Sequence, residues 1–212
     1  MVSADTISDR LIENWQTARD GADFPLRSSF RPMSMGRYLS NTYILAADQG
    51  QIYYRLAGSE MEHIWGRSLG DQNITVLMSH IVNYNIYHGL INHAMNAGCG
   101  FYIQGVIKDI YGNFYDVDEV VLPYLTEGDT QATEAVQTDH RTAGHHIELI
   151  GAQLFPAKKP SSFNHQDVSY TLTKVQLIPA AEKSVHLPPA LQMQIERDSV
   201  DLTIVSDVPV AA

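Results

Sequence analysis

The sequence predicts an α+β fold in which one antiparallel sheet carries helices packed across one face. The first observation is the order of the elements: an N-terminal helix, two strands, short helical turns, a long helix and then three strands. The second is that short glycine-containing turns, at 48–50 and 111–113, join two of the strand pairs. Such turns are typical of antiparallel hairpins. Strands on both sides of a helical crossover therefore indicate a single sheet.

The first part of the chain, residues 1–40, predicts an amphipathic helix and an extended lead-in. Apolar side chains recur at helical spacing from Ile7 to Ala18, with Trp15 at the centre. Pro25 and Pro32 hold the following segment extended or in turns. An amphipathic helix must cover a surface, either its own sheet or a second copy of the protein. We expect the Trp15 face to be a homodimer or output contact.

A pair of strands and a short helix come next, at the start of a core that we predict to span residues 41–157. In the second strand, "QIYYRLAG", Tyr54 and Leu56 share one face with Ile52 because side chains alternate along a strand. The segment "SEMEHIWG" then predicts one or two helical turns. Met61, Ile64 and Trp65 lie on one side of these turns, where they can cover the sheet.

The long helix is predicted from Ser79 to Gly98, and a helical wheel gives it an apolar face. That face carries His80, Tyr84, Tyr87, His88, Ile91, Ala94 and Met95. Strands are expected at 101–112, 114–126 and 145–155, with a long polar loop before the last of them. Residues 158–212 are predicted to be a C-terminal extension, partly irregular, in which 168–179 can add a strand.

Composition limits the possible partners and the compartment. A length of 212 residues allows one domain with extensions, and a net charge of −10 argues against a nucleic-acid partner. The single cysteine, Cys99, cannot form an internal disulfide and is expected to be a packing residue. No secretory signal and no apolar run long enough to span a membrane is present. The sequence therefore predicts a cytoplasmic protein without membrane contact.

Two motif blocks resemble a family of small stand-alone bacterial PAS-domain proteins. The first is the lead-in "WQTARDGADFPLRSSFRP", with a Trp, an Arg-x-Gly and a Pro-x-Arg ahead of the sheet. The second is "YRLAGSEMEHIWGRSLG", an aromatic-Arg-Leu-x-Gly strand end that leads to an aromatic-Gly-Arg turn. The resemblance covers roughly residues 10 to 156, and its matching positions occur in order. The long polar loop and the tail after Lys158 depart from the pattern.

The resemblance implies a five-stranded antiparallel sheet in the order 2-1-5-4-3, with a helical flank that closes a small cavity. It also implies a sensory or regulatory role, with a small-molecule ligand in the cavity and a signal that leaves by contact with a protein partner. The inward faces chosen above give the expected ligand-binding residues as Tyr54, Leu56, Met61, Ile64, Trp65, Tyr84, His88, Ile91, Ile103 and Leu122. Between the two glycines of the second block, Arg55 and Arg67 can fix a carboxylate or tie the turn to backbone carbonyls, and we favour the tie.

No cofactor is required by the sequence. A His on the long helix ligates iron in haem-binding PAS domains, but for His88 a core or half-buried structural role is favoured over haem. His140, His145 and His146 have no zinc-ligand spacing, so no metal site is expected. Asp116, Asp118 and Glu119 are not expected to form a catalytic pair, and the usual catalytic motifs do not occur, so no catalysis is expected.

Three alternatives remain open from the sequence. In the first, Met, Tyr and Trp side chains fill the cavity, and the protein is a pocketless interaction module. The second is a haem sensor. The third is a small enzyme on a related α+β fold, for which the sequence offers no nucleophile and base pair.

Overall fold

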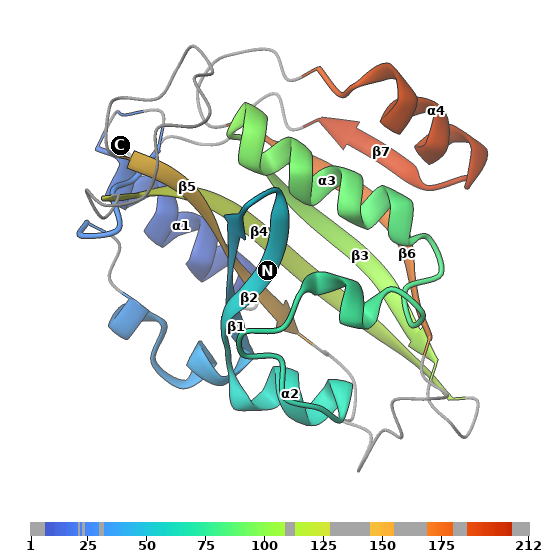
Figure 1. The fold of residues 1–212 in the computed structure, drawn as a ribbon, viewed down its shortest axis with the longest axis horizontal. Helices are drawn as coiled ribbons and strands as arrows, with labels where there is room; N and C mark the ends of the chain where they lie inside the picture. Colours follow the sequence, from blue (N-terminus) through green and yellow to red (C-terminus); the bar gives the residue numbers. More distant parts are fainter. Residues whose placement is uncertain are drawn as a thin grey trace, which may run out of the picture.

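The computed structural model describes residues 7–20, 22, 24–29, 32–108, 113–127, 145–154, 169–179 and 186–204. One seven-stranded sheet runs through them in the order β2-β1-β5-β4-β3-β6-β7 (Figure 1). The strands are β1 (Thr42–Asp48), β2 (Gln51–Ala57), β3 (Gly100–Lys108), β4 (Phe114–Glu127), β5 (His145–Leu154), β6 (Ser169–Ile178) and β7 (Asp201–Ile204). The helices are α1 (Ile7–Arg19), η1 (Pro32–Asn41), α2 (Ser59–Trp65), η2 (Ile74–Leu77), α3 (Tyr84–Ala97) and α4 (Pro189–Arg197).

The predicted five-stranded order 2-1-5-4-3 is confirmed, and the sheet continues beyond it. In the C-terminal extension, β6 pairs antiparallel with β3, and β7 pairs parallel with β6. The hairpin between β1 and β2 is also confirmed, since Asp48 pairs with Gln51 across a two-residue turn. Both turn residues, Gln49 and Gly50, have positive φ, as this type of hairpin requires. The expected turn at 111–113 lies largely outside the described residues.

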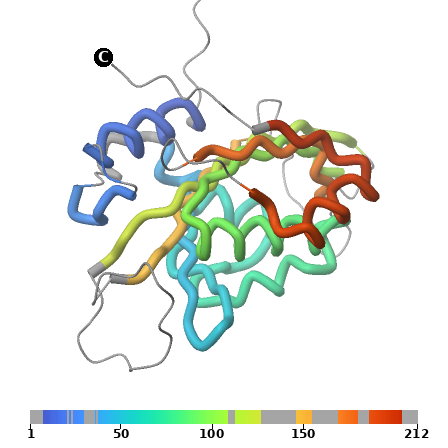
Figure 2. Tube along the Cα trace, turned by 90° about the horizontal axis from the view of Figure 1, so that it is seen from above, coloured from blue at the N-terminus to red at the C-terminus, as the bar shows by residue number. Residues whose placement is uncertain are grey.

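Helices cover both faces of the sheet and bury a separate apolar cluster on each. Helices α2, α3 and α4 lie on one side of the sheet and α1 on the other (Figure 2). The larger cluster includes residues of α2, α3 and α4, and the smaller one includes residues of α1. Strand alternation divides the sheet residues between the two clusters, so that neighbours along one strand face opposite sides. None of the described helices combines the length and the apolar content that crossing a membrane requires.

The expectation that Trp15 lies on an exposed surface is wrong. Its side chain is completely buried against the sheet, and its indole Nε1 donates a 2.6 Å hydrogen bond to the carbonyl of Pro123 on β4. Leu11 is completely buried beside it. The helix therefore covers its own sheet, which was the other possibility for an amphipathic helix, and it leaves polar residues such as Asp9 and Glu13 on the outside.

The long helix begins at Tyr84, five residues later than predicted. The segment before it pairs with β6 instead: Tyr170 donates its N–H to the carbonyl of His80, and Val82 donates to the carbonyl of Tyr170. The Asn83 side chain then bonds both the N–H and the carbonyl of Leu172, at 3.0 and 3.1 Å. These bonds replace a first helical turn, so His80 does not lie on the helix face to which the sequence assigned it.

Candidate functional site

The side chain of Glu119 lies in the middle of the sheet face that α3 covers. Strand β4 alternates so that Val117, Glu119 and Val121 point toward this face, and all three are buried, with Glu119 completely so. A carboxyl group in an apolar core is unfavourable unless hydrogen bonds satisfy it. Its partners therefore define the chemistry of the interior.

Hydroxyl groups of three tyrosines from three different elements donate to this carboxyl group. Tyr43 of β1 and Tyr87 of α3 donate to Oε1, the latter at 3.0 Å, and Tyr170 of β6 donates to Oε2 at 3.3 Å. Gln153 of β5 also hydrogen-bonds the Glu119 side chain. The indole of Trp65 in turn donates to Gln153 at 3.2 Å. Every one of these partners is almost completely buried.

Two glycines let tyrosines from distant strands reach Glu119. In the sheet, β5 separates Tyr43 from β4, and β3 separates Tyr170 from β4. The rings cross these intervening strands at Gly151 and Gly105. A Cβ atom at Gly151 would lie 2.1 Å from Cζ of Tyr43, and one at Gly105 would lie 2.4 Å from Cε2 of Tyr170. Both strands therefore need glycine at the point where a ring passes over the backbone.

Burial dominates the electrostatics of this cluster. Desolvation raises the pKa of Glu119, while the hydrogen bonds from Tyr43, Gln153, Tyr87 and Tyr170 act in the opposite direction. Desolvation, followed by the nearby Glu119 charge, also raises the pKa of Tyr43 and Tyr170 well above the ordinary value of a phenol. The phenols are therefore neutral donors at physiological pH, and they suit a site that holds a proton or a neutral polar group.

Six of the predicted ligand-binding residues lie in the apolar cluster around Glu119. They are buried to within one per cent of complete burial: Tyr54, Met61, Ile64, Trp65, Ile91 and Ile103. The ring of Tyr54 packs edge-on against Tyr43, with centroids 5.7 Å apart, and its hydroxyl group hydrogen-bonds Tyr87. The predicted interior is thus assembled, and these side chains fill the space between the sheet and α3.

Leu56 does not share a face with Tyr54, contrary to the alternation predicted for β2. The pairing register shifts here: Ile44 of β1 faces Leu56, and the next residue, Leu45, faces Tyr54. Arg55 is thus an extra residue in β2, a β-bulge that reverses the alternation after it. Leu56 is 49% exposed as a result.

Leu122 is also misassigned, although it is completely buried. It belongs to the smaller cluster with Leu11 and Trp15 under α1, on the face opposite to Glu119. The predicted inward face of β4 was therefore shifted by one residue. In a strand that is buried on both sides, hydrophobicity alone does not distinguish the two faces.

Tyr84 and His88 lie at the edge of the interior and are half-buried. Their rings stack with centroids 5.5 Å apart, and the Asn92 amide nitrogen lies 3.2 Å from the His88 ring nitrogens. These contacts agree with the structural role favoured for His88. The Tyr84 hydroxyl group, in contrast, is buried and has no hydrogen-bond partner among the described residues.

Other candidates from the sequence have ordinary surroundings. Burial raises the pKa of the Cys99 thiol to about 12, as expected for a packing residue. His146 lies in β5, His140 lies outside the described residues, and the described part of the chain holds no His, Cys, Asp and Glu cluster that could bind a metal ion. Arg67 ties its turn to the Val76 carbonyl at 3.0 Å, as favoured, whereas Arg55 fixes a carboxylate, that of Glu148.

The tyrosine cluster and its centre were not predicted from the sequence. Glu119 was considered only together with Asp116 and Asp118, which fall on the other side of the strand. The usable signal was the run Val117, Glu119, Val121, in which a carboxylate takes an apolar place in a period of two. Tyr170 had no such signal, because the position of its strand in the sheet was open.

A single mixed sheet with helices packed on both faces makes this an α+β protein. A family model described as PAS domain matches residues 4–133, which is more than half of the chain. The chain therefore belongs to the PAS domain family, and its role is of the sensory or regulatory kind. The search of curated proteins gave no match, and neither did the search of solved structures.

Proposed function

We propose that this PAS domain regulates a protein partner by shifting α3 and β6 relative to the sheet, without catalysing a reaction. The observation that carries the proposal is the carboxyl group of Glu119, to which hydroxyl groups from β1, α3 and β6 all donate. Its hydrogen-bonding capacity is met within the chain. This favours the packed interior over an open ligand cavity.

The contacts of Glu119 couple the elements that would move. The segment before α3 is bonded to β6 through His80, Val82 and Asn83, and α4 packs on α3 through Leu191. A change in the bonding of Glu119 therefore acts on Tyr87 and Tyr170 together. A fully satisfied buried network holds one arrangement, so a switch would need a second packing that satisfies the same groups.

Amide hydrogen exchange tests this coupling. Glu119→Gln keeps the shape of the side chain but changes which groups can donate and accept. We expect faster exchange in α3 and β6, with exchange in α1 unchanged. Gly70→Ala, whose added Cβ atom meets no atom within 4 Å, is the control. Equal acceleration in all elements would indicate general destabilisation and would contradict the proposal.

A small-molecule ligand remains the second candidate function, and the Tyr84 hydroxyl group favours it. This buried group has no partner among the described residues, and Tyr84 lines a hollow of about 320 Å³ between the start of α3 and α4. A polar ligand would supply the missing hydrogen bond. Mass spectrometry of the gently desorbed protein distinguishes the two candidate functions. A retained small molecule supports ligand binding, and the mass of the chain alone supports the packed interior.

A homodimer through α1 is also proposed, in a form that does not use Trp15. The outer face of the helix offers Asp9, Glu13 and Thr17, so the contact would be polar. Glu13→Lys should then weaken self-association in a sedimentation experiment without changing the unfolding midpoint. An unchanged profile of a dimeric protein would exclude this face.

A further inference from the structure

A hollow of about 360 Å³ lies where the lead-in to the sheet passes the end of β4. Its lining residues are Leu26, Arg27, Ser28, Leu125 and Thr126. The walls are fixed by backbone bonds, because Arg27 donates to the Leu125 carbonyl at 2.8 Å and Leu125 donates to the Pro25 carbonyl at 3.0 Å. The N–H of Ser29 donates to the carbonyl of Leu26 and closes a turn, with Arg27 and Ser28 at its two central positions.

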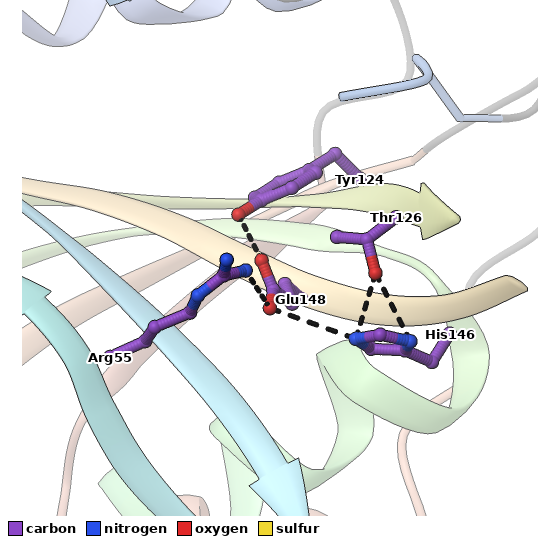
Figure 3. A network of polar contacts seen from close by, with 5 residues as sticks. All are labelled: Arg55, Tyr124, Thr126, His146 and Glu148. Atoms are coloured by element: carbon purple, nitrogen blue, oxygen red, sulfur yellow. Dashed lines mark hydrogen bonds and ion pairs between the residues drawn. The ribbon is translucent and has the colours of Figure 1, made fainter. Parts of the chain in front are cut away.

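Beside this hollow a buried carboxylate is already neutralised. Glu148 is 1% exposed, its Oε1 pairs with the Arg55 guanidinium at 2.5 Å, and the Tyr124 hydroxyl group donates to Oε2 (Figure 3). Arg55 follows Tyr54 in β2, so alternation places it on the face opposite to Tyr54, where it meets Glu148. Arg55 therefore already pairs with the Glu148 carboxylate, which needs no second guanidinium.

That second guanidinium belongs to Arg27, which is exposed at the hollow. Burial raises the pKa of Tyr124, and the charges of Arg27 and Arg55 oppose this rise, so both cations lie within electrostatic reach of its hydroxyl group. Within the described part of the chain, no carboxylate forms an ion pair with Arg27. A chain with a net charge of −10 therefore presents a spare positive charge here.

Hydroxyl groups complete a set of hydrogen-bond donors. Thr126 is 2% exposed, and its Oγ1 lies 2.7 Å from Nε2 of His146 on the paired strand. When the imidazole donates to this oxygen, the threonine hydrogen is free to point into the hollow. Ser28 is exposed and also lines the hollow. Leu26 and Leu125 supply an apolar surface between them.

We propose that this hollow binds a small oxyanion, a carboxylate or a phosphate group, through the guanidinium of Arg27 and the hydroxyl groups of Ser28 and Thr126. A planar guanidinium matches two oxygens of such a group, and neutral hydroxyls add bonds without adding charge. The site shares no residue with the Glu119 cluster. An anion at Thr126 also connects through His146, Glu148 and Arg55 to the edge strand β2.

Calorimetric titration of the full chain tests the site, with inorganic phosphate in one arm and succinate in the other, at constant ionic strength. We expect saturable binding of at least one anion, weakened about tenfold or more by Arg27→Gln and by Ser28→Ala. Arg197→Gln removes the same charge from an exposed position on α4 and should leave the affinity unchanged. Binding in only one arm identifies the anion class.

Two results would overturn the proposal. One is the failure of both anions to bind at millimolar concentration. The other is equal binding by the parent protein, Arg27→Gln and Arg197→Gln, which would indicate a general salt effect. Folding of each variant is verified by its circular dichroism and unfolding midpoint. Because the backbone of Arg27, and not its side chain, holds the wall of the hollow, the substitution should leave both unchanged.

Discussion

Tyr43 and Tyr170 lie on strands that are separated by three others, yet both hydroxyl groups donate to the same carboxyl group. Each ring crosses a neighbouring strand at a glycine to reach Glu119. Tyr170 lies beyond residue 133, where the family match ends. The polar centre of this PAS domain is therefore completed by a strand of the C-terminal extension.

The ring of Tyr43 passes directly over Gly151, so even the methyl group of alanine should not fit at this position. Gly151→Ala places a Cβ atom 2.1 Å from Cζ of Tyr43, and the resulting overpacking should lower the free energy of unfolding by about 1–3 kcal/mol. Gly70→Ala is the matched control, since its Cβ atom meets no atom within 4 Å. Urea denaturation measures both variants. Equal midpoints for the two would contradict the close approach.

The pH dependence of stability should report on Glu119. Its pKa is raised by burial above the ordinary value of 4.5, so the folded state keeps the proton to higher pH than the unfolded state does. The contribution of Glu119 is then complete below about pH 4.5 and is lost as the pH rises through the raised value.

The non-titrating variant Glu119→Gln isolates this effect, because the other groups cancel in the comparison. The stability of the parent protein relative to the variant should fall as the pH rises above about 4.5. Unfolding free energies from urea titrations over a pH series measure the difference. A difference that grows with pH would mean that the folded protein prefers the carboxylate form.

We expect Trp15→Phe to lower the free energy of unfolding and to leave self-association unchanged. The substitution keeps most of the apolar ring but removes the Nε1 bond to the Pro123 carbonyl, which leaves a buried acceptor unpaired at a cost of about 1–3 kcal/mol. Chemical denaturation measures the loss, and Gly70→Ala, whose added Cβ atom meets no atom within 4 Å, serves as the reference. A lower sedimentation coefficient at unchanged stability would restore Trp15 to an intermolecular surface.

Arg55 and Glu148 should be strongly coupled. Arg55→Gln strands a buried carboxylate, and we expect a loss of about 2–3 kcal/mol, less than for a fully buried pair because the Arg55 side chain is 38% exposed. The double variant with Glu148→Gln should be more stable than the sum of the single effects predicts. Strict additivity would show that the ion pair contributes nothing of its own.

The resemblance to PAS domains implied the order of the first five strands, and local patterns predicted most of the interior. Period-two alternation located Tyr54 and Ile103, and helical spacing located Ile91, all now in one cluster. The predictions from alternation failed at Leu56 because a β-bulge shifts the register there. They failed at Leu122 because the strand is buried on both faces, so hydrophobicity does not show which way a side chain points. A one-residue change of register reverses every assignment after it.

The polar centre could not be read from the sequence for a different reason. Its members come from β1, β4, α3 and β6, and their meeting depends on which strands are neighbours and on where glycines allow a ring to pass. Gly105 and Gly151 were visible as isolated glycines within strands, a recognised sign of close approach. Which tyrosine ring passes over each glycine depends on which strands are neighbours in the assembled sheet.

The central place of β5 has a consequence for synthesis on the ribosome. It lies between β1 and β4 and pairs with both, but it follows them in the chain by many residues. Until residues 145–154 emerge, the first two hairpins cannot join, and each presents unpaired strand edges to other nascent chains. The sheet should therefore close only late in translation, when its fifth strand inserts.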